Sequence, residues 1–187
     1  MPAYTARKIV QEGIPSLTLS VVISLASGSI LNRGIELFVA LPVLLALTPP
    51  LAGMAGSIGS IFSSRLSTAL HLGLVKPRIE HSEVLTRNVF AVSTIAIVSS
   101  MYLSLVMYIL SEFAGIRGLS LFEMAEVTVM AAILVSSITL IAALFISFLS
   151  YRRNLDPGST TIPIVTAIGD LATSISIILA ARVLGLV

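Results

Sequence analysis

The chain has 187 residues, of which 56% are hydrophobic and only 11% charged, and its mean hydropathy is +1.05. Because a soluble domain carries about 25% charged residues, this composition excludes a soluble globular protein, and the net charge of +2 is too small to indicate a nucleic-acid partner. The chain has no cysteine, which excludes a disulfide framework, a thiolate metal site and a cysteine nucleophile.

Long stretches without charge predict an all-α integral membrane protein with five transmembrane helices. A bilayer core of about 30 Å is crossed by about 20 apolar helical residues, and each stretch reaches that length. In a single domain covering residues 1–187, we expect spans at about 14–32, 36–72, 88–112, 121–151 and 157–184.

The basic residues between the spans predict the orientation in the membrane. The first 15 residues lack the apolar core and small-residue cleavage site of a signal peptide, and we expect an amphipathic cytoplasmic lead-in there. The lead-in and two alternate loops hold Arg7, Lys8, Lys76, Arg78, Arg87, Arg152 and Arg153, whereas the other loops hold only Arg33 and Arg117. Because cytoplasmic loops are rich in Lys and Arg, the N-terminus is expected in the cytoplasm and the C-terminus outside, in a multi-pass protein of the cell membrane.

The second span contains helix-breaking residues, in the stretch LTPPLAGMAGSIGS. Pro49 and Pro50 cannot continue a regular hydrogen-bond ladder, and Gly53, Gly56 and Gly59 recur every three residues. We therefore expect this span to be broken by proline and glycine, with exposed backbone that lines a wet cavity. A kink combined with a small-residue packing face is an equally good interpretation of this segment alone.

Two carboxylates open the fourth span, near the expected outer surface. Glu123 and Glu126 are three residues apart and therefore share one helix face. They are candidates for an outer vestibule that gathers cations, although acidic residues also commonly begin a helix.

The fifth span carries a polar stripe. Asp156, Ser159, Pro163, Thr166 and Asp170 are spaced by three or four residues, which places them on one helix face. Because Pro163 lacks an N–H group, the carbonyl of Ser159 on that face loses its usual partner. In a continuous helix the two carboxylates lie about 21 Å apart, with Asp156 at the cytoplasmic mouth and Asp170 near mid-membrane.

A carboxylate inside a membrane is costly unless it faces a cavity and has a partner. No Lys or Arg is expected at the depth of Asp170, so its partner could be a mobile cation. Oxygen ligands without Cys or His favour a hard cation, and a site with few carboxylates favours Mg²⁺, which keeps several waters. Alternatively, Asp170 is protonated and hydrogen-bonds a Ser or Thr of a neighbouring helix.

At these residues the chain resembles a known family. The segment DPGSTTIPIVTAIGDLATSISIILAARVLGL (156–186) is similar to the last pore helix of the MgtE magnesium channels and transporters and of their relatives in solute carrier family 41. The residues that match that family's motif in identity and spacing are Asp156, Pro157, Pro163, Thr166 and Asp170. The segment GSIGSIFSSRLSTALHLG (56–73) looks like the pore-lining part of the family's second helix, and its SRLSTALHLG part (64–73) is closest to the solute carrier branch.

The chain also departs from the family pattern. Ser57 and Ile61 replace an Asn and a Gln of the bacterial proteins, so those side-chain contacts are absent. We find no counterpart of the family's cytoplasmic N-terminal and CBS domains, so gating by their magnesium sites is not implied. The chain has one transmembrane unit where the solute carrier members have two, which implies a homodimer with Asp170 contributed by both copies.

The resemblance implies an MgtE-type pore domain that conducts Mg²⁺ between the second and fifth helices, with membrane lipid, a second copy and divalent cations as partners and no cofactor. The residues implied to bind the ion are Asp170, Asp156, Thr166, Ser159, Gly56 and Gly59.

An intramembrane enzyme is disfavoured, because no mid-membrane Lys, Cys or His is present to activate a nucleophile. A Na⁺- or H⁺-coupled carrier of another ion or solute and a non-transporting assembly subunit stay open. So do the choice among Mg²⁺, Mn²⁺, Co²⁺ and Ca²⁺, the choice between channel and carrier, the direction of transport and its regulation.

Overall fold

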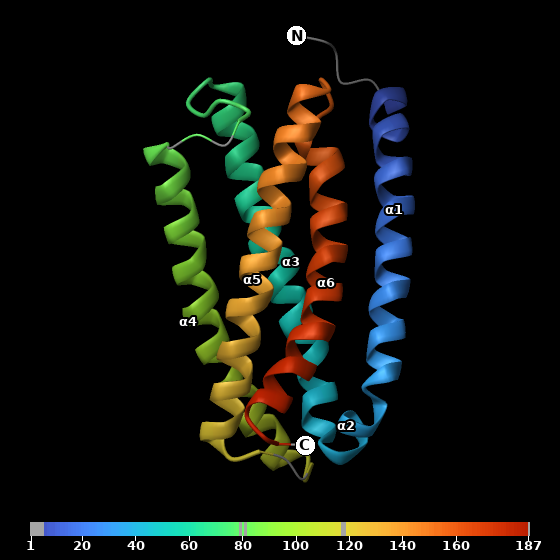
Figure 1. The fold of residues 1–187 in the computed structure, drawn as a ribbon, viewed down its shortest axis with the longest axis vertical. Coiled ribbons are helices and arrows are strands. Elements are labelled where there is room, and N and C mark those ends of the chain that lie inside the picture. Colours follow the sequence, from blue (N-terminus) through green and yellow to red (C-terminus); the bar gives the residue numbers. More distant parts are fainter. Residues whose placement is uncertain (1–5, 79, 81, 117–118, 187) are drawn as a thin grey trace.

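The computed structural model describes residues 6–78, 80, 82–116 and 119–186, with the backbone alone at 8, 9 and 157–159. In these residues the chain is helical and contains no strand. The helices are α1 (Ala6–Arg33), α2 (Ile35–Ala40), α3 (Pro42–His71), α4 (Glu83–Phe113), α5 (Leu121–Arg152) and α6 (Pro157–Val183) (Figure 1). All but α2 are long and apolar enough to cross a membrane, which confirms the predicted all-helical fold with five candidate spans.

The break in the second predicted span lies elsewhere than expected. The chain is interrupted at Gly34 and at Leu41, whereas α3 runs without interruption through Pro49, Pro50 and the three glycines. The backbone of Leu41 has φ −128° and ψ 77°, because a residue before a proline, here Pro42, is sterically disfavoured in the helical region. The expectation of a break at Pro49, Pro50 or the glycines is therefore wrong.

Pro49 and Pro50 are tolerated because of where they sit on α3. They remove the N–H donors that the carbonyls of Leu45 and Ala46 would otherwise accept. All four residues are exposed at the bundle surface, so the freed carbonyls are not buried against apolar neighbours. The hydroxyl of Thr48 donates to the carbonyl of Leu44 at 2.9 Å, which supports the turn before the two prolines.

The long helices stand side by side, and the start of α1 and the end of α6 lie at opposite ends of the bundle, called here its N-terminal and C-terminal ends (Figure 1). α1, α4 and α6 begin, and α3 and α5 end, at the N-terminal end. This end therefore gathers the basic residues Arg7, Lys76, Arg78, Arg87, Arg152 and Arg153, as the positive-inside argument requires. The orientation of this end toward the cytoplasm stays a prediction.

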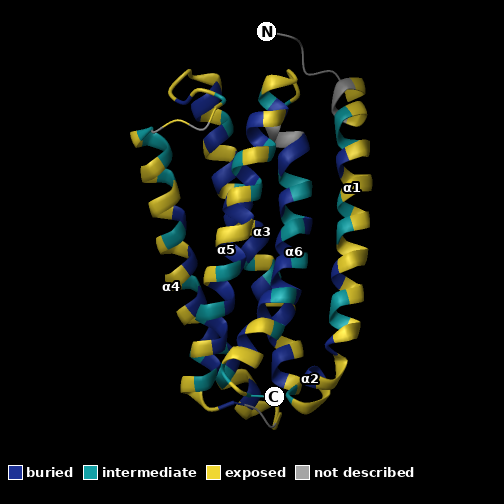
Figure 2. Ribbon diagram, viewed as in Figure 1, coloured by how far each residue is buried: buried dark blue, intermediate teal, exposed yellow. Residues whose placement is uncertain are grey.

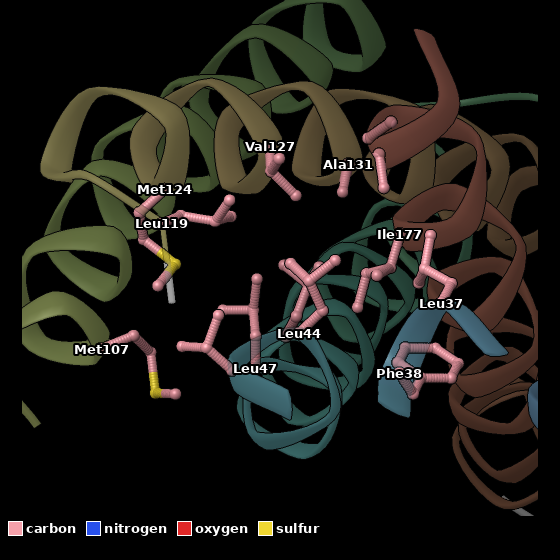
Figure 3. Packing of buried hydrophobic residues seen from close by; sticks show 14 of the residues in the cluster. Leu37, Phe38, Leu44, Leu47, Met107, Leu119, Met124, Val127, Ala131 and Ile177 are labelled. Carbon is pink, nitrogen blue, oxygen red and sulfur yellow. The ribbon is translucent and has the colours of Figure 1, made fainter. Parts of the chain in front are cut away.

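The core is built around three helices. α3, α5 and α6 pack extensively against one another, α4 packs on α3 and α5, and α1 packs along α6. Figure 2 shows the burial concentrated on α3, α5 and α6, whereas most of α1 is exposed. At the C-terminal end, α2 closes the bundle, because Leu37 and Phe38 pack with Leu44 and Ile177 in one buried cluster (Figure 3).

Candidate functional site

Asp170 lies on a part of α6 that the rest of the chain leaves uncovered. α1 and α3 both pack along α6, but they make no extensive contact with each other. Between them, Pro163, Thr166 and Asp170 remain partly exposed on one face of α6. We call these three residues the open strip.

The open strip ends at Asp170. One turn further along α6, Thr173 and Ser174 are 0% and 1% exposed, and Ile177 is fully buried in the cluster that α2 closes. Asp170 therefore occupies the last open position of its helix face. Toward the N-terminal end of the bundle the same face leads back to Asp156, about 21 Å away at 1.5 Å per residue.

The backbone at Asp170 is held by α1. The hydroxyls of Ser27 on α1 and Ser174 on α6 hydrogen-bond each other at 2.8 Å, and both lie 3.1 Å from the carbonyl oxygen of Asp170, which accepts from this pair. Among the described residues, none donates a hydrogen bond to the Asp170 carboxylate or forms an ion pair with it. Ser27 was missed at the sequence level, although Ser16, Ser20 and Ser27 are spaced to share one face of α1.

We expect Ser27→Ala to lower the free energy of unfolding by about 0.6–1.5 kcal/mol, because the hydrogen bonds that link the Ser27 hydroxyl on α1 to the Asp170 carbonyl and the Ser174 hydroxyl on α6 are lost. Thermal unfolding of the purified protein in detergent measures the effect. Ser20→Ala is the matched control, because the hydrogen bond of the Ser20 hydroxyl to a described residue lies within α1, at the carbonyl of Ser16. Equal effects of the two substitutions would show that Ser27 does not couple the helices.

The structure brings two of the sequence candidates, Gly56 and Thr166, into contact. A Cβ on Gly56 would lie 3.0 Å from Cγ2 and 3.6 Å from Oγ1 of Thr166. A Cβ on Gly169 would lie 3.4 Å from the backbone nitrogen of Gly56. The absence of side chains at both glycines thus lets α3 and α6 approach closely beside the open strip.

Gly59 lies away from the open strip. It is buried, and a Cβ there would collide with Cγ1 of Val165 and would lie 2.7 Å from Cγ2 of Thr139. Gly59 therefore sits where α3, α5 and α6 meet, which agrees with the packing interpretation of the glycine repeat. A role of its carbonyl in ion binding stays a prediction.

The outer face of α3 borders the open strip and is rich in oxygen atoms. Pro50, Gly53, Ser57 and Ser64 are exposed on this face, and Ser60 is partly exposed. The hydroxyls of Ser57 and Ser60 donate to carbonyls one turn earlier in α3, at 2.9 and 2.8 Å. With the two carbonyls freed by the prolines, this face presents backbone and hydroxyl oxygens from its middle turns onward, interrupted by the exposed side chain of Ile61.

Asp156 lies at the N-terminal end of the bundle, where α1 and α6 meet. Its backbone N–H donates to Oε2 of Glu12 on α1 at 3.3 Å, and its carbonyl accepts the Thr160 hydroxyl at 2.8 Å. Glu12 thus ties α1 to the start of α6, a role that the sequence did not reveal. The backbone of Ser159 lies in the first turns of α6, four residues before Pro163, and its side chain lies outside the described part.

Glu123 and Glu126 lie at the opposite end of the bundle. Glu123 forms a capping box with Ser120, whose backbone N–H and hydroxyl both donate to its carboxylate at 2.8 Å. Glu126 is exposed on the next turn. Glu123 therefore begins α5, and a cation-gathering role of the two residues stays a prediction.

A single copy of the chain offers few charged ligands at any one place. In the described ranges, no three His, Cys, Asp or Glu side chains gather closely enough to hold a metal ion. A cation at Asp170 would therefore meet one carboxylate of this chain, with hydroxyl and carbonyl oxygens beside it. Such a site suits an ion that retains several of its waters.

Comparison with known proteins identifies the family. The model of the MgtE family, described as divalent cation transporters, matches residues 48–180, which is more than half of the chain and extends from α3 into α6. No curated protein and no solved structure matches the chain. Together with the five apolar helices, the match shows that the chain is a multi-pass membrane protein and belongs to the MgtE family of divalent cation transporters.

Proposed function

We propose that the chain transports Mg²⁺ as a homodimer, along a pore lined by α3 and α6 of both copies. The observation that carries the proposal is the partly exposed carboxylate of Asp170 within a membrane-spanning helix, beside the oxygen-rich outer face of α3. The test is Mg²⁺ uptake into proteoliposomes that hold the wild-type chain or Asp170→Asn.

Lipid is a poor neighbour for this surface. Acyl chains supply no hydrogen-bond donors and no countercharge, so a carboxylate facing them is strongly disfavoured. Non-apolar surface at membrane depth is tolerated when it lines a water-filled path or is buried in protein. In this proposal the open strip and the outer face of α3 together line such a water-filled path.

Two copies would supply what one copy lacks. A two-fold axis beside the open strip would bring two Asp170 carboxylates to the same depth. Their combined charge of −2 would neutralise one divalent ion and would bind a monovalent ion less well. Mg²⁺ suits the site best, because its retained waters can bridge to Thr166 and to the carbonyls near Gly56.

The ends of the path carry further carboxylates. Asp156 and Glu12 lie at the N-terminal end of the bundle, in line with the open strip, and would concentrate cations at a cytoplasmic mouth. Glu123 and Glu126 lie at the other end, where an outer vestibule would be. The capping hydrogen bonds of Glu123 leave its negative charge in place, so Glu123 can both begin α5 and attract cations to the vestibule.

The homodimer predicts a specific cross-link. Because the natural chain has no cysteine, Ser57→Cys introduces a single thiol on the outer face of α3. We expect a short bifunctional thiol reagent to convert most of this variant in membranes to a covalent dimer. The matched control is Ser137→Cys, which places an exposed thiol on α5. Equal dimer yields from the two variants, or no dimer from either, would contradict the proposed interface.

A further inference from the structure

A pocket of about 330 Å³ lies at the N-terminal end of the bundle, away from the open strip. It is formed by the last turns of α5 and the segment that joins α3 to α4. Its lining consists of four apolar residues and two arginines: Phe145, Ile146, Phe148, Leu149, Arg78 and Arg152. The apolar residues precede the end of α5, and both arginines lie at its rim.

The two arginines are held in place by the loop. Nε of Arg152 donates to the carbonyl of Pro77 at 2.7 Å, and Nε of Arg78 donates to the carboxylate of Glu80 at 2.6 Å. Each guanidinium has five N–H donors, and no described residue accepts from the terminal nitrogens of either one. The hydrogen bond from the Arg78 guanidinium also holds the pKa of Glu80 below its ordinary value, which favours the ionised carboxylate. That carboxylate accepts from one nitrogen of Arg78 and leaves the other N–H donors of both arginines available to a ligand.

The apolar part of the pocket lies on the side of the arginines that faces the middle of α5. Arg152 ends α5, and Phe145 lies seven residues before it, which is about 10 Å nearer the middle of this candidate membrane span. Phe145 and Leu149 are 54% and 50% exposed, so their side chains meet whatever surrounds the bundle. A ligand that fits must be negatively charged at the rim and apolar below it.

We propose that this pocket binds one anionic phospholipid, with its phosphate between Arg78 and Arg152 and an acyl chain over Phe145 and Leu149. Guanidinium groups bind phosphate oxygens through paired N–H bonds. Basic residues at a membrane surface favour anionic lipids. The pocket lies on α5 and its loop, whereas the proposed pore lies on α3 and α6, so the lipid site does not depend on ion transport.

The test is a lipid titration of the full chain in detergent. The thermal unfolding midpoint is followed while phosphatidylglycerol is added, and phosphatidylcholine with the same acyl chains is the comparison. We expect phosphatidylglycerol to raise the midpoint and phosphatidylcholine to have little effect. Replacing one arginine by Gln should weaken the apparent affinity for phosphatidylglycerol about fivefold, and replacing both about 25-fold.

The controls separate a built site from general charge. Arg153→Gln removes a charge from the exposed residue next to Arg152 that does not line the pocket, and it should leave the affinity unchanged. Arg152→Lys keeps the charge and should retain more affinity than Arg152→Gln. Each variant is compared with its own lipid-free midpoint, so a loss of basal stability does not affect the result. Equal responses to the two lipids, equal losses in Arg153→Gln and Arg152→Gln, or the same shift from millimolar inorganic phosphate would overturn the proposal.

Discussion

Asp170→Asn is expected to reduce Mg²⁺ uptake into proteoliposomes by at least tenfold. The substitution keeps the shape of the side chain and removes the negative charge, twice in a homodimer. Loss of one charge-assisted contact costs about 1.5–3 kcal/mol, which is about one to two orders of magnitude in ion binding. Uptake is followed with a Mg²⁺ indicator inside the vesicles.

The matched control is Glu112→Gln, which removes an exposed carboxylate from α4, away from the open strip. Its uptake should equal that of the wild type. Asp170→Glu restores the charge one methylene further out and should recover part of the flux. If Asp170→Asn folds to the same thermal midpoint and transports Mg²⁺ at the wild-type rate, the proposed role of Asp170 is wrong.

The same vesicles separate the open alternatives for mechanism. A stationary pore conducts Mg²⁺ down its own gradient, whereas a coupled carrier responds to an imposed Na⁺ or H⁺ gradient. Wild-type uptake that does not change with either gradient favours a channel. Competition by Mn²⁺, Co²⁺ and Ca²⁺ in this assay ranks the divalent ions. Absence of uptake in the wild type itself would instead favour a non-transporting assembly subunit.

Gly59→Val is expected to lower the free energy of unfolding by about 3 kcal/mol or more, the largest effect on stability among our predictions. Even the Cβ of an alanine would collide with Val165 and approach Thr139 to 2.7 Å. Both neighbours are β-branched and therefore stiff at χ1, so α5 and α6 would have to move apart from α3. Gly59→Ala should give a smaller loss, about 1–3 kcal/mol.

Gly28→Ala is the control for this prediction and has the opposite expected sign. Gly28 is exposed inside α1, away from the proposed pore helices, and no described atom outside its own turn lies within 4 Å of the position where its Cβ would be. Alanine is favoured over glycine inside a helix by about 1 kcal/mol, so the variant should be as stable as the wild type or more stable. Thermal unfolding in detergent measures both variants. A Gly59→Ala protein as stable as Gly28→Ala would contradict the packing described for α3.

Several features of the fold follow from the composition of single segments and can be predicted from the sequence. Span length, polar ends and the spacing of Asp156 and Asp170 on one helix face are properties of single segments, because a bilayer imposes a fixed length and a helix a fixed period. The five long helices therefore lie close to the expected ranges, and the resemblance to the MgtE family is confirmed by the family match over residues 48–180. Pro42 is also a local signal for the break at Leu41, because the residue before a proline is disfavoured in the helical region, but Pro49 and Pro50 are more prominent in the sequence.

Which faces of these helices are covered depends on how the helices pack against one another. Prolines inside α3 are tolerated because the carbonyls that they free lie on an exposed face, and no single-segment pattern reveals that exposure. Gly59 is a packing contact and Gly56 borders the open strip, although the two glycines occur in the same repeat. Asp170 remains open because α1 and α3 pack on opposite sides of its face, while Ser27 holds its backbone from 143 residues away. These outcomes depend on contacts between segments far apart in the chain, because burial is a property of the neighbours that surround a residue as much as of the residue itself.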